Sequence, residues 1–281
     1  AKIVLIDTQK DSLEMNYDDL ESAINEKTKA IIPVHYAGMP CDIKAIKDIA
    51  EDHNLVVIED NAESFGASID GKMVGTFGDS AMVSFCQNKI ITTGDGGAIV
   101  TDDKDIYEKL KLIRSHGRLD TENYFDTNAY MDYITLGYNF RLPNILSALG
   151  VAQMDKVDTV LALRKKAAEY YNNRISKELP EIILPTKPDG YDFVYQLYPI
   201  RTPKRDELME FMKENGIMTK VYFTPVHHSY YYKNVLNIHP NLPITERVGN
   251  ENLCLPFYPG ISEEELNLVV DTMVDFFHKN I

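Results

Sequence analysis

The sequence predicts an α/β fold with a largely parallel sheet, followed by a smaller α+β unit. Three observations carry this prediction. Apolar runs alternate with helical patterns through the first half of the 281 residues, as expected for parallel strands joined by helices. Two of the apolar runs lead directly to charged residues, at Asp60 and at Lys89. The segment Pro180–Gly190 then precedes a mixed strand and helix pattern, which indicates a second unit.

The strands and helices of the first half follow from these runs in order. The run before Asp60 is typical of a strand buried in a parallel sheet. Asn16 is a candidate N-cap for a helix that ends near Asn25. We expect strands at Lys2–Asp7, Ala30–His35, Leu55–Asp60, Ala81–Phe85 and Gly97–Thr101, and helices at Asp42–His53 and Asp105–Ser115.

A long helical pattern from about Pro143 to Lys177 predicts a helix that connects two domains. The expected boundaries are a large domain over residues 1–155 and a small domain over residues 156–281, which includes the end of that helix. In the small domain we expect strands at Val194–Ile200 and Met218–Tyr222, and helices at Arg205–Asn215 and from Glu263.

Composition excludes several classes of partner. The formal net charge is −14 and no Lys/Arg-rich run occurs, which argues against nucleic acid or an anionic membrane as a partner. No apolar run approaches the roughly 20 residues that span a bilayer, and the N-terminus lacks a signal-peptide pattern, so a cytoplasmic location is expected. The cysteines Cys41, Cys86 and Cys254 lack metal-binding spacing, so we expect reduced thiols and no metal site.

Lys89 and Asp60 are the residues that point to a reaction. Lys89 lies just before the glycine-rich segment Gly94–Gly97, and Asp60 ends a predicted strand. Pyridoxal 5'-phosphate (PLP) chemistry needs a lysine that forms a Schiff base and a carboxylate that keeps the pyridine nitrogen protonated. Two alternatives stay open. Lys89 can be a solvated turn lysine, and Glu59 becomes the inward acid if the strand register shifts by one residue.

Three motifs resemble those of one family. Their sequences are Glu-Asp-Asn-Ala-Glu-Ser-Phe-Gly at 59–66, Gly-Asp at 78–79, and the lysine motif from Ser84 through Lys89 to Gly97. In this order they resemble the DegT/StrS family of PLP-dependent sugar aminotransferases, over essentially the whole chain. The resemblance implies an aspartate aminotransferase-like large domain of fold type I.

The resemblance also implies roles for the residues of these motifs. Lys89 matches the Schiff-base lysine and Asp60 the partner of the pyridine nitrogen, while Ala62 packs on a face of the cofactor ring. Ser84 matches a phosphate-binding serine. Glu63 stands near the cofactor's phenolic oxygen where many relatives carry Gln or His, which leaves its role open between cofactor contact and solvated acid.

Two further segments resemble the family. Gly-Tyr-Asn-Phe-Arg at 137–141 matches a segment whose asparagine, here Asn139, reaches the cofactor phosphate of a neighbouring subunit, which implies a homodimer with shared sites. Arg141 either binds a substrate carboxylate or phosphate or anchors the following helix by an ion pair. His227 matches a histidine near the sugar nucleotide, and Gln196 stands where relatives often have His.

One departure concerns the start of the chain. The family normally carries a further N-terminal segment with a phosphate-binding loop and an aromatic residue that stacks on the cofactor. No such segment precedes Lys2, so we expect an N-terminally incomplete large domain, either a fragment or one piece of a split protein.

The function expected from the resemblance is transfer of an amino group from glutamate to a nucleoside-diphosphate keto-deoxysugar, most similar to 4-keto, perosamine-type members that serve polysaccharide synthesis. Two alternatives remain. A PLP-dependent sugar dehydratase would carry histidine at the lysine position, against which Lys89 argues, and a truncated homologue could act only as a binding or assembly module. A nicotinamide-binding Rossmann enzyme is excluded because Gly94–Gly97 lacks the G-x-G-x-x-G spacing.

Overall fold

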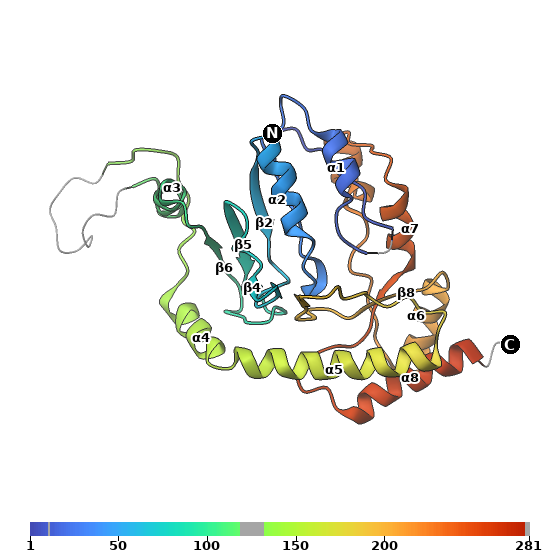
Figure 1. Ribbon diagram of the computed structural model, residues 1–281. Helices are drawn as coiled ribbons and strands as arrows, with labels where there is room; N and C mark the ends of the chain where they lie inside the picture. Colours follow the sequence, from blue (N-terminus) through green and yellow to red (C-terminus); the bar gives the residue numbers. More distant parts are fainter. Residues whose placement is uncertain (11, 119–131, 279–281) are drawn as a thin grey trace.

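The computed structural model describes residues 1–10, 12–118 and 132–278 and shows a mixed α/β molecule (Figure 1). A four-stranded sheet in the order β1-β2-β5-β6 forms its centre. β1 and β2 are parallel, as are β2 and β5, whereas β6 runs antiparallel to β5. The bounds of these strands are β1 (Ala30–Ile31), β2 (Val56–Asp60), β5 (Ser80–Ser84) and β6 (Gly97–Val100).

Two capped helices accompany this sheet. The Asn16 side chain accepts a hydrogen bond from Asp19 N and begins α1 (Tyr17–Ala23), as predicted. The Asp42 side chain caps α2 (Ile43–Asp52) in the same way. α2 lies alongside β2 (Figure 1) and buries Ile43, Ile46 and Ala50 on one face. α3 (Lys104–Arg114) follows β6 and is capped by Asp103.

Two of the predicted first-half strands are wrong or too long. Residues 2–7 form no strand, and the Asp7 carboxylate accepts hydrogen bonds from Ile244 N and Thr245 N at the start of α7 (Pro243–Glu251). The strand expected at Ala30–His35 ends at Ile31, since Pro33 has no N–H to continue the ladder. Only an isolated bridge from Val34 to Asp60 extends this pairing.

The long predicted helix is two helices. α4 (Asn144–Met154) and α5 (Val157–Glu178) are separated by two residues, of which Lys156 takes φ −112° and ψ −3°, well away from the about −63° and −42° of a regular α-helix. The break lets the two helices take different directions, and α5 runs beneath the sheet in Figure 1. Its C-terminal half packs against α8 (Glu263–His278).

The C-terminal part contains less sheet than predicted. The segment expected as a strand at Val194–Ile200 is irregular until β8 (Pro199–Arg201), partly because Tyr195 takes a left-handed φ of 50°. The strand expected at Met218–Tyr222 is reduced to one bridge between Lys220 and Cys254. The remaining elements are β3 (Ser68–Ile69), β4 (Lys72–Met73), β7 (Tyr191–Asp192), α6 (Arg205–Glu214), β9 (Asn252–Cys254), the short helices η1 (Tyr36–Gly38) and η2 (Val226–His228), and the π-helical η3 (Tyr231–Val235).

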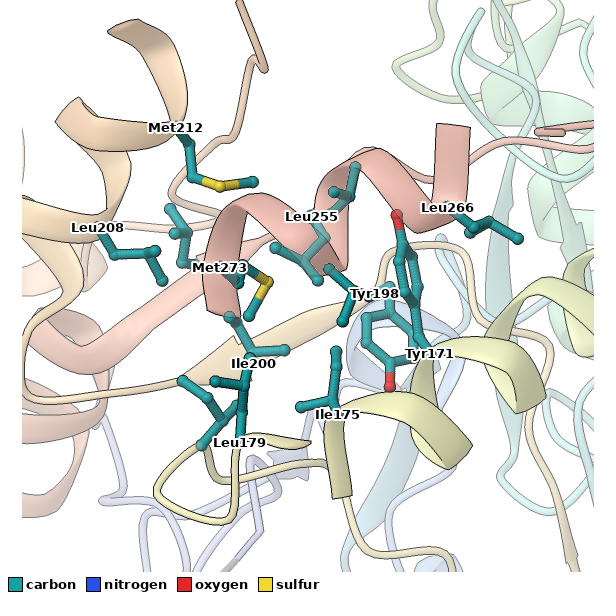
Figure 2. Close-up of a cluster of buried hydrophobic side chains, with 14 of the residues drawn as sticks. Tyr171, Ile175, Leu179, Tyr198, Ile200, Leu208, Met212, Leu255, Leu266 and Met273 are labelled. Atoms are coloured by element: carbon teal, nitrogen blue, oxygen red, sulfur yellow. The ribbon is translucent and has the colours of Figure 1, made fainter. Parts of the chain in front are cut away.

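Two clusters of buried apolar side chains stabilise the molecule. One joins α2, β2 and the segments around the sheet, and the other joins α5, α6, β8, β9 and α8. Figure 2 shows the second cluster, in which side chains from α5 and α8 meet those from β8 and α6. Val194 belongs to the first cluster although it follows α5 in sequence, so the C-terminal part of the chain packs against the sheet region.

Candidate active site

Lys89 lies in the turn that connects β5 to β6, at the C-terminal end of a sheet strand. The two strands pair antiparallel, with Ser84 opposite Gly97. Backbone hydrogen bonds from Lys89 N to Cys86 O (3.1 Å) and from Thr93 N to Phe85 O (3.0 Å) hold the turn. The lysine is therefore presented from a fixed backbone, and it lies at the sheet edge where α/β folds bind ligands.

Two of the glycines after Lys89, Gly96 and Gly97, are required by close packing. A Cβ at Gly97 would lie 2.6 Å from Val83 O, inside the β5–β6 ladder. Gly96 has φ +133°, and a Cβ there would lie 2.9 Å from Leu142 Cδ1. The glycine-rich turn thus allows the segment that leads into α4 to pack directly on the lysine motif.

Glu63 is the partner of Lys89. Lys89 Nζ lies 3.3 Å from Glu63 Oε1, and both side chains are largely buried, with 14% and 10% exposed. The other carboxylate oxygen, Glu63 Oε2, accepts a hydrogen bond of 2.9 Å from Ala37 N. The structure therefore excludes the solvated-acid interpretation of Glu63 and the solvated-turn interpretation of Lys89.

A second connection reaches Lys89 from the C-terminal part of the chain. The Gln196 side-chain amide donates a hydrogen bond to the carbonyl of Asn88, next to the lysine. Backbone bonds from Val194 N to Gly38 O (3.0 Å) and from Leu197 N to Ala37 O (3.3 Å) fix the Gln196 segment. Together these contacts surround Lys89 with a set of residues that we call the Lys89 cluster: Ala37, Gly38, Glu63, Asn88, Lys89 and Gln196.

Arg164 supports the Lys89 cluster from α5. Its guanidinium donates to the carbonyl oxygens of Tyr195 (3.0 Å) and Gln196 (3.2 Å), which holds the left-handed turn at Tyr195. Burial lowers the pKa of Arg164 to about 10. The role of Arg164 has no signal in the sequence, since Arg164 lies within an ordinary helical pattern, whereas Gln196 stands at a position where relatives often have His.

The two acids at the end of β2 have separate environments. Glu59 is fully buried and accepts hydrogen bonds from His35 Nε2 (2.9 Å), Gly75 N (2.7 Å) and Gly78 N (2.6 Å). Burial acts to raise the pKa of Glu59, but the hydrogen bonds from His35 and the backbone outweigh it, so the pKa is lowered. The Glu59 carboxylate is therefore fully used by contacts inside the protein. Asp60, the next residue, points to the opposite face of the sheet and is the strand-end acid that stays partly accessible.

Asp60, Ala62 and Ser84 lie at the ends of two neighbouring parallel strands. Asp60 pairs with Met82 of β5, two residues before Ser84. Asp60 Oδ1 accepts a hydrogen bond of 3.1 Å from Ala62 N, and Ser84 Oγ accepts one of 3.3 Å from Cys86 N. All three are half-buried, which leaves their side chains partly accessible at the edge that carries the lysine turn.

Three of the predicted site residues lie apart from the Lys89 cluster. Within the described part of the chain, no hydrogen bond or ion pair joins the cluster to Asn139, Arg141 or His227. Asn139 and Arg141 are exposed, and Arg141 Nε donates to Asn139 Oδ1 at 3.2 Å. His227 is buried in η2, with its Nε2 3.3 Å from Glu246 Oε1. Their predicted roles near cofactor and substrate stay predictions.

The groups around Lys89 fit a PLP molecule by their chemistry. A largely buried primary amine, a strand-end carboxylate and a strand-end hydroxyl match the three groups that this cofactor needs for its aldehyde, ring nitrogen and phosphate. Gln196 Oε1 is buried and accepts no hydrogen bond within the described residues, so an acceptor beside the lysine remains available to a ligand.

Comparison with known proteins decides the family. The model of the DegT/DnrJ/EryC1/StrS aminotransferase family matches residues 1–274. This chain belongs to that family. The DegT/DnrJ/EryC1/StrS proteins are PLP-dependent sugar aminotransferases, so the expected enzyme class and fold type I are both confirmed.

Named relatives agree with this assignment. GDP-perosamine synthase of Escherichia coli O157:H7 is 34% identical over 278 residues, which cover 99% of this chain and 73% of that protein. The spore coat polysaccharide biosynthesis protein SpsC of Bacillus subtilis is 30% identical over 286 residues, covering 98% and 73%. The chain thus spans about three quarters of these family members.

Solved structures of the family superpose closely. DesV of S. venezuelae is 30% identical, with a TM-score of 0.89 over 98% of this chain and 72% of that one. A structure from Streptococcus pneumoniae in its PLP-form is 25% identical, with a TM-score of 0.90 over 100% of this chain and 76% of that one.

No helix within the described residues is sufficiently long and apolar to cross a membrane.

Proposed function

We propose that this protein transfers an amino group from glutamate to the keto group of a nucleoside-diphosphate keto-deoxysugar, with a 4-keto sugar as the expected acceptor, for the synthesis of a cell-surface polysaccharide or glycan. The observation that carries the proposal is the largely buried Lys89 amine, 3.3 Å from Glu63 within the Lys89 cluster. The GDP-perosamine synthase and SpsC relatives support the substrate class.

Lys89 Nζ would bind the cofactor and move the proton at the substrate carbon. PLP, when bound, supplies an aldehyde that carries the amino group and a ring that accepts electrons. Glutamate would give up its amino group and leave as 2-oxoglutarate, and that amino group would replace the keto oxygen of the sugar. One water would be consumed as 2-oxoglutarate forms and one released as the sugar amine forms. Glu63 orients the lysine, since its second oxygen is fixed by Ala37 N and only Oε1 faces Nζ. Because Glu63 fixes the position of Lys89 Nζ, a proton carried by this nitrogen would be delivered from one defined position in the site.

The remaining first-half residues would hold the cofactor. Asp60 would pair with the pyridine nitrogen and keep it protonated, and Ala62 would pack on a face of the ring. Ser84 would donate its hydroxyl to the phosphate. The support is their common position at the ends of β2 and β5. Gln196 Oε1 offers an acceptor for a substrate or cofactor donor beside Lys89.

The residues outside the Lys89 cluster fit an arrangement with a second subunit. Asn139 and Arg141 are exposed and bonded to each other, as expected for side chains that complete a neighbouring site in a homodimer. Arg141 would bind an anionic group of the substrate, and His227 would contact the sugar nucleotide. The proposed domain boundary lies near residue 155, where α4 and α5 separate. The proposed location of the protein is the cytoplasm.

The first test is lysine-dependent cofactor binding. PLP added to the purified chain should produce a visible absorption band that borohydride reduction fixes covalently at Lys89, as peptide mass spectrometry would show. Lys89→Ala should lose the band and the adduct. Lys165→Ala is the matched control, because Lys165 is also partly buried and paired with a carboxylate, at 2.6 Å from Asp192. An adduct that survives in Lys89→Ala would contradict the proposal.

The second test separates amine transfer from other reactions of the family. Incubation with glutamate should release 2-oxoglutarate, and a nucleoside-diphosphate 4-keto-6-deoxysugar should then gain an amine, measured by mass. Lys89→Ala should lower this rate by at least about 10²-fold, in line with loss of a group that transfers a proton. Loss of water from the sugar without amine gain would instead favour the dehydratase.

A further inference from the structure

A group of side chains of the types that bind metal ions lies outside the Lys89 cluster. His227 and His228 are adjacent in η2, and Glu246 lies on α7. One ligand atom from each of the three lies within 4.8 Å of the others. His227 Nε2 is 3.3 Å and His228 Nε2 is 3.6 Å from the same oxygen, Glu246 Oε1. The sequence did not reveal this group, because Glu246 is brought to the histidines only by the fold.

The distances fit a shared metal ion. His227 Nε2 and Glu246 Oε1, at 3.3 Å, are within hydrogen-bond distance, but their separation exceeds the about 2.7–2.9 Å of a charge-assisted hydrogen bond. The 3.6 Å between His228 Nε2 and the same oxygen is too long for a hydrogen bond. Zinc binds nitrogen at about 2.0–2.1 Å and carboxylate oxygen at about 2.0–2.2 Å, so the ligand atoms of a tetrahedral site lie about 3.3–3.5 Å apart. The two nitrogen–oxygen separations, 3.3 and 3.6 Å, are close to this range.

The kind of ion follows from the ligands. Two imidazole nitrogens and one carboxylate oxygen suit zinc and other first-row transition metals, whereas magnesium and calcium prefer oxygen ligands alone. Three protein ligands leave a fourth position of a tetrahedral ion open. His227 is 4% exposed but His228 and Glu246 are 33% and 43% exposed, so an ion can enter from solvent and still reach the buried nitrogen.

We propose that His227, His228 and Glu246 bind one divalent transition-metal ion, with zinc as the expected ion. Two ligands come from η2 and one from α7, so the ion would tie these two elements together. Binding to the folded chain alone raises its stability, because the three ligands are not assembled in the unfolded chain. The proposal shares His227 with the proposed contact to the sugar nucleotide, but it does not rest on the aminotransferase reaction, and its test measures zinc binding alone.

The test is a zinc titration of the whole chain after treatment with chelator, followed by calorimetry. The expected result is one equivalent of bound zinc and no binding of magnesium. His228→Ala and Glu246→Gln should each weaken zinc binding by at least about 10-fold, since even residues that only support a metal ligand have effects of that size. His239→Ala is the matched control, because His239 is exposed and outside the group, and it should bind zinc as the wild type does.

Further measurements test whether a variant has lost its fold and whether zinc binds only at scattered surface groups. Far-ultraviolet circular dichroism without metal should be the same for wild type and variants, and zinc should raise the melting temperature only where all three ligands remain. Cobalt should give the visible spectrum of a four-coordinate ion, lost in His228→Ala. The proposal is overturned if zinc fails to bind the wild type, or if His228→Ala and Glu246→Gln bind it as tightly.

Discussion

Glu59 and Glu63 show how two acids from one short motif acquire opposite environments. Glu59 points into the protein, where His35 and three backbone N–H groups satisfy both of its oxygens. Glu63 points to Lys89 and has one oxygen for the lysine and one for Ala37 N. The hydrogen bonds to Glu59 occupy both oxygens of its carboxylate. Of these two glutamates, only Glu63 is therefore available to take part in a reaction.

The lowered pKa of Glu59 predicts a dependence of stability on pH. The unfolded carboxyl binds its proton near pH 4.3, whereas the folded one binds it only at lower pH. The stabilisation is therefore complete above about pH 4.3 and is lost as the pH falls through the folded pKa. Urea unfolding should show a free-energy difference between wild type and Glu59→Gln that is largest near pH 7 and shrinks below pH 4.3.

The control for this experiment is Glu264→Gln, since Glu264 is exposed on α8. Its difference from the wild type should be small at every pH. A gap between wild type and Glu59→Gln that stays constant down to pH 3 would contradict the stated role of the Glu59 carboxylate.

At the scale of elements, the segment 36–38 joins the sheet region to the segment 194–197. Gly38 has φ +89°, and a Cβ there would lie 2.5 Å from Gln196 N and 2.7 Å from Tyr195 N. Its carbonyl accepts the hydrogen bond from Val194 N. The two backbones can approach this closely only because residue 38 has no side chain.

Gly38→Ala should therefore destabilise the protein more than the backbone strain alone explains. Gly216→Ala is the matched control, because Gly216 has φ +77° but no atom within 4 Å of a Cβ. We expect a loss of about 1–2 kcal/mol for Gly216→Ala from its left-handed backbone, and a further loss of about 1–3 kcal/mol for Gly38→Ala from overpacking. Equal losses in urea unfolding would show that the close approach is unimportant.

The sequence predicted elements well where the signal is local. The cap at Asn16, the helix that begins near Asp42 and the glycine-rich turn after Lys89 depend on neighbouring residues, and the structure contains all three. Predictions were wrong where distant contacts decide. The strand expected at Val194–Ile200 is replaced by an irregular segment that is hydrogen-bonded to residues 37–38. The strand expected at Lys2–Asp7 is absent, and the Asp7 carboxylate accepts a hydrogen bond from Thr245 N in α7.

The same distinction applies to the candidate site. The sequence named Lys89 and Glu63, and the structure brings them together. It did not predict that Gln196 binds the Asn88 carbonyl or that Arg164 supports Gln196, because these contacts join residues far apart in the chain. Periodicity and motif spacing carry no information on such contacts.

At the scale of the whole molecule, the C-terminal apolar cluster supports the segment that reaches Lys89. Tyr195 belongs to this cluster, together with Tyr171 and Tyr198, whose rings lie 4.8 Å apart. The neighbouring residue Val194 belongs to the cluster around the sheet. The two clusters therefore meet within two consecutive residues, and the position of Gln196 depends on both.

A pair of leucines on α8 tests the energetic weight of this cluster. Leu266→Ala should lower the free energy of unfolding by about 2–5 kcal/mol, because Leu266 is 5% exposed and packs in the cluster of Figure 2. Leu268→Ala changes the same side chain on the same helix at 56% exposure and should cost less than about 1 kcal/mol. Similar losses for both variants in urea unfolding would contradict the assigned packing.

The Lys89 cluster has a consequence for the order of events on the ribosome. Its members come from residues 37–38, 63, 88–89 and 196, and the Gln196 to Asn88 contact spans 108 positions. Protein synthesis proceeds from the N-terminus, so β2, β5 and the lysine itself leave the ribosome well before the residue that closes the cluster. A nascent chain can therefore form the Lys89–Glu63 pair early, but Lys89 is enclosed only after residue 196 has been made.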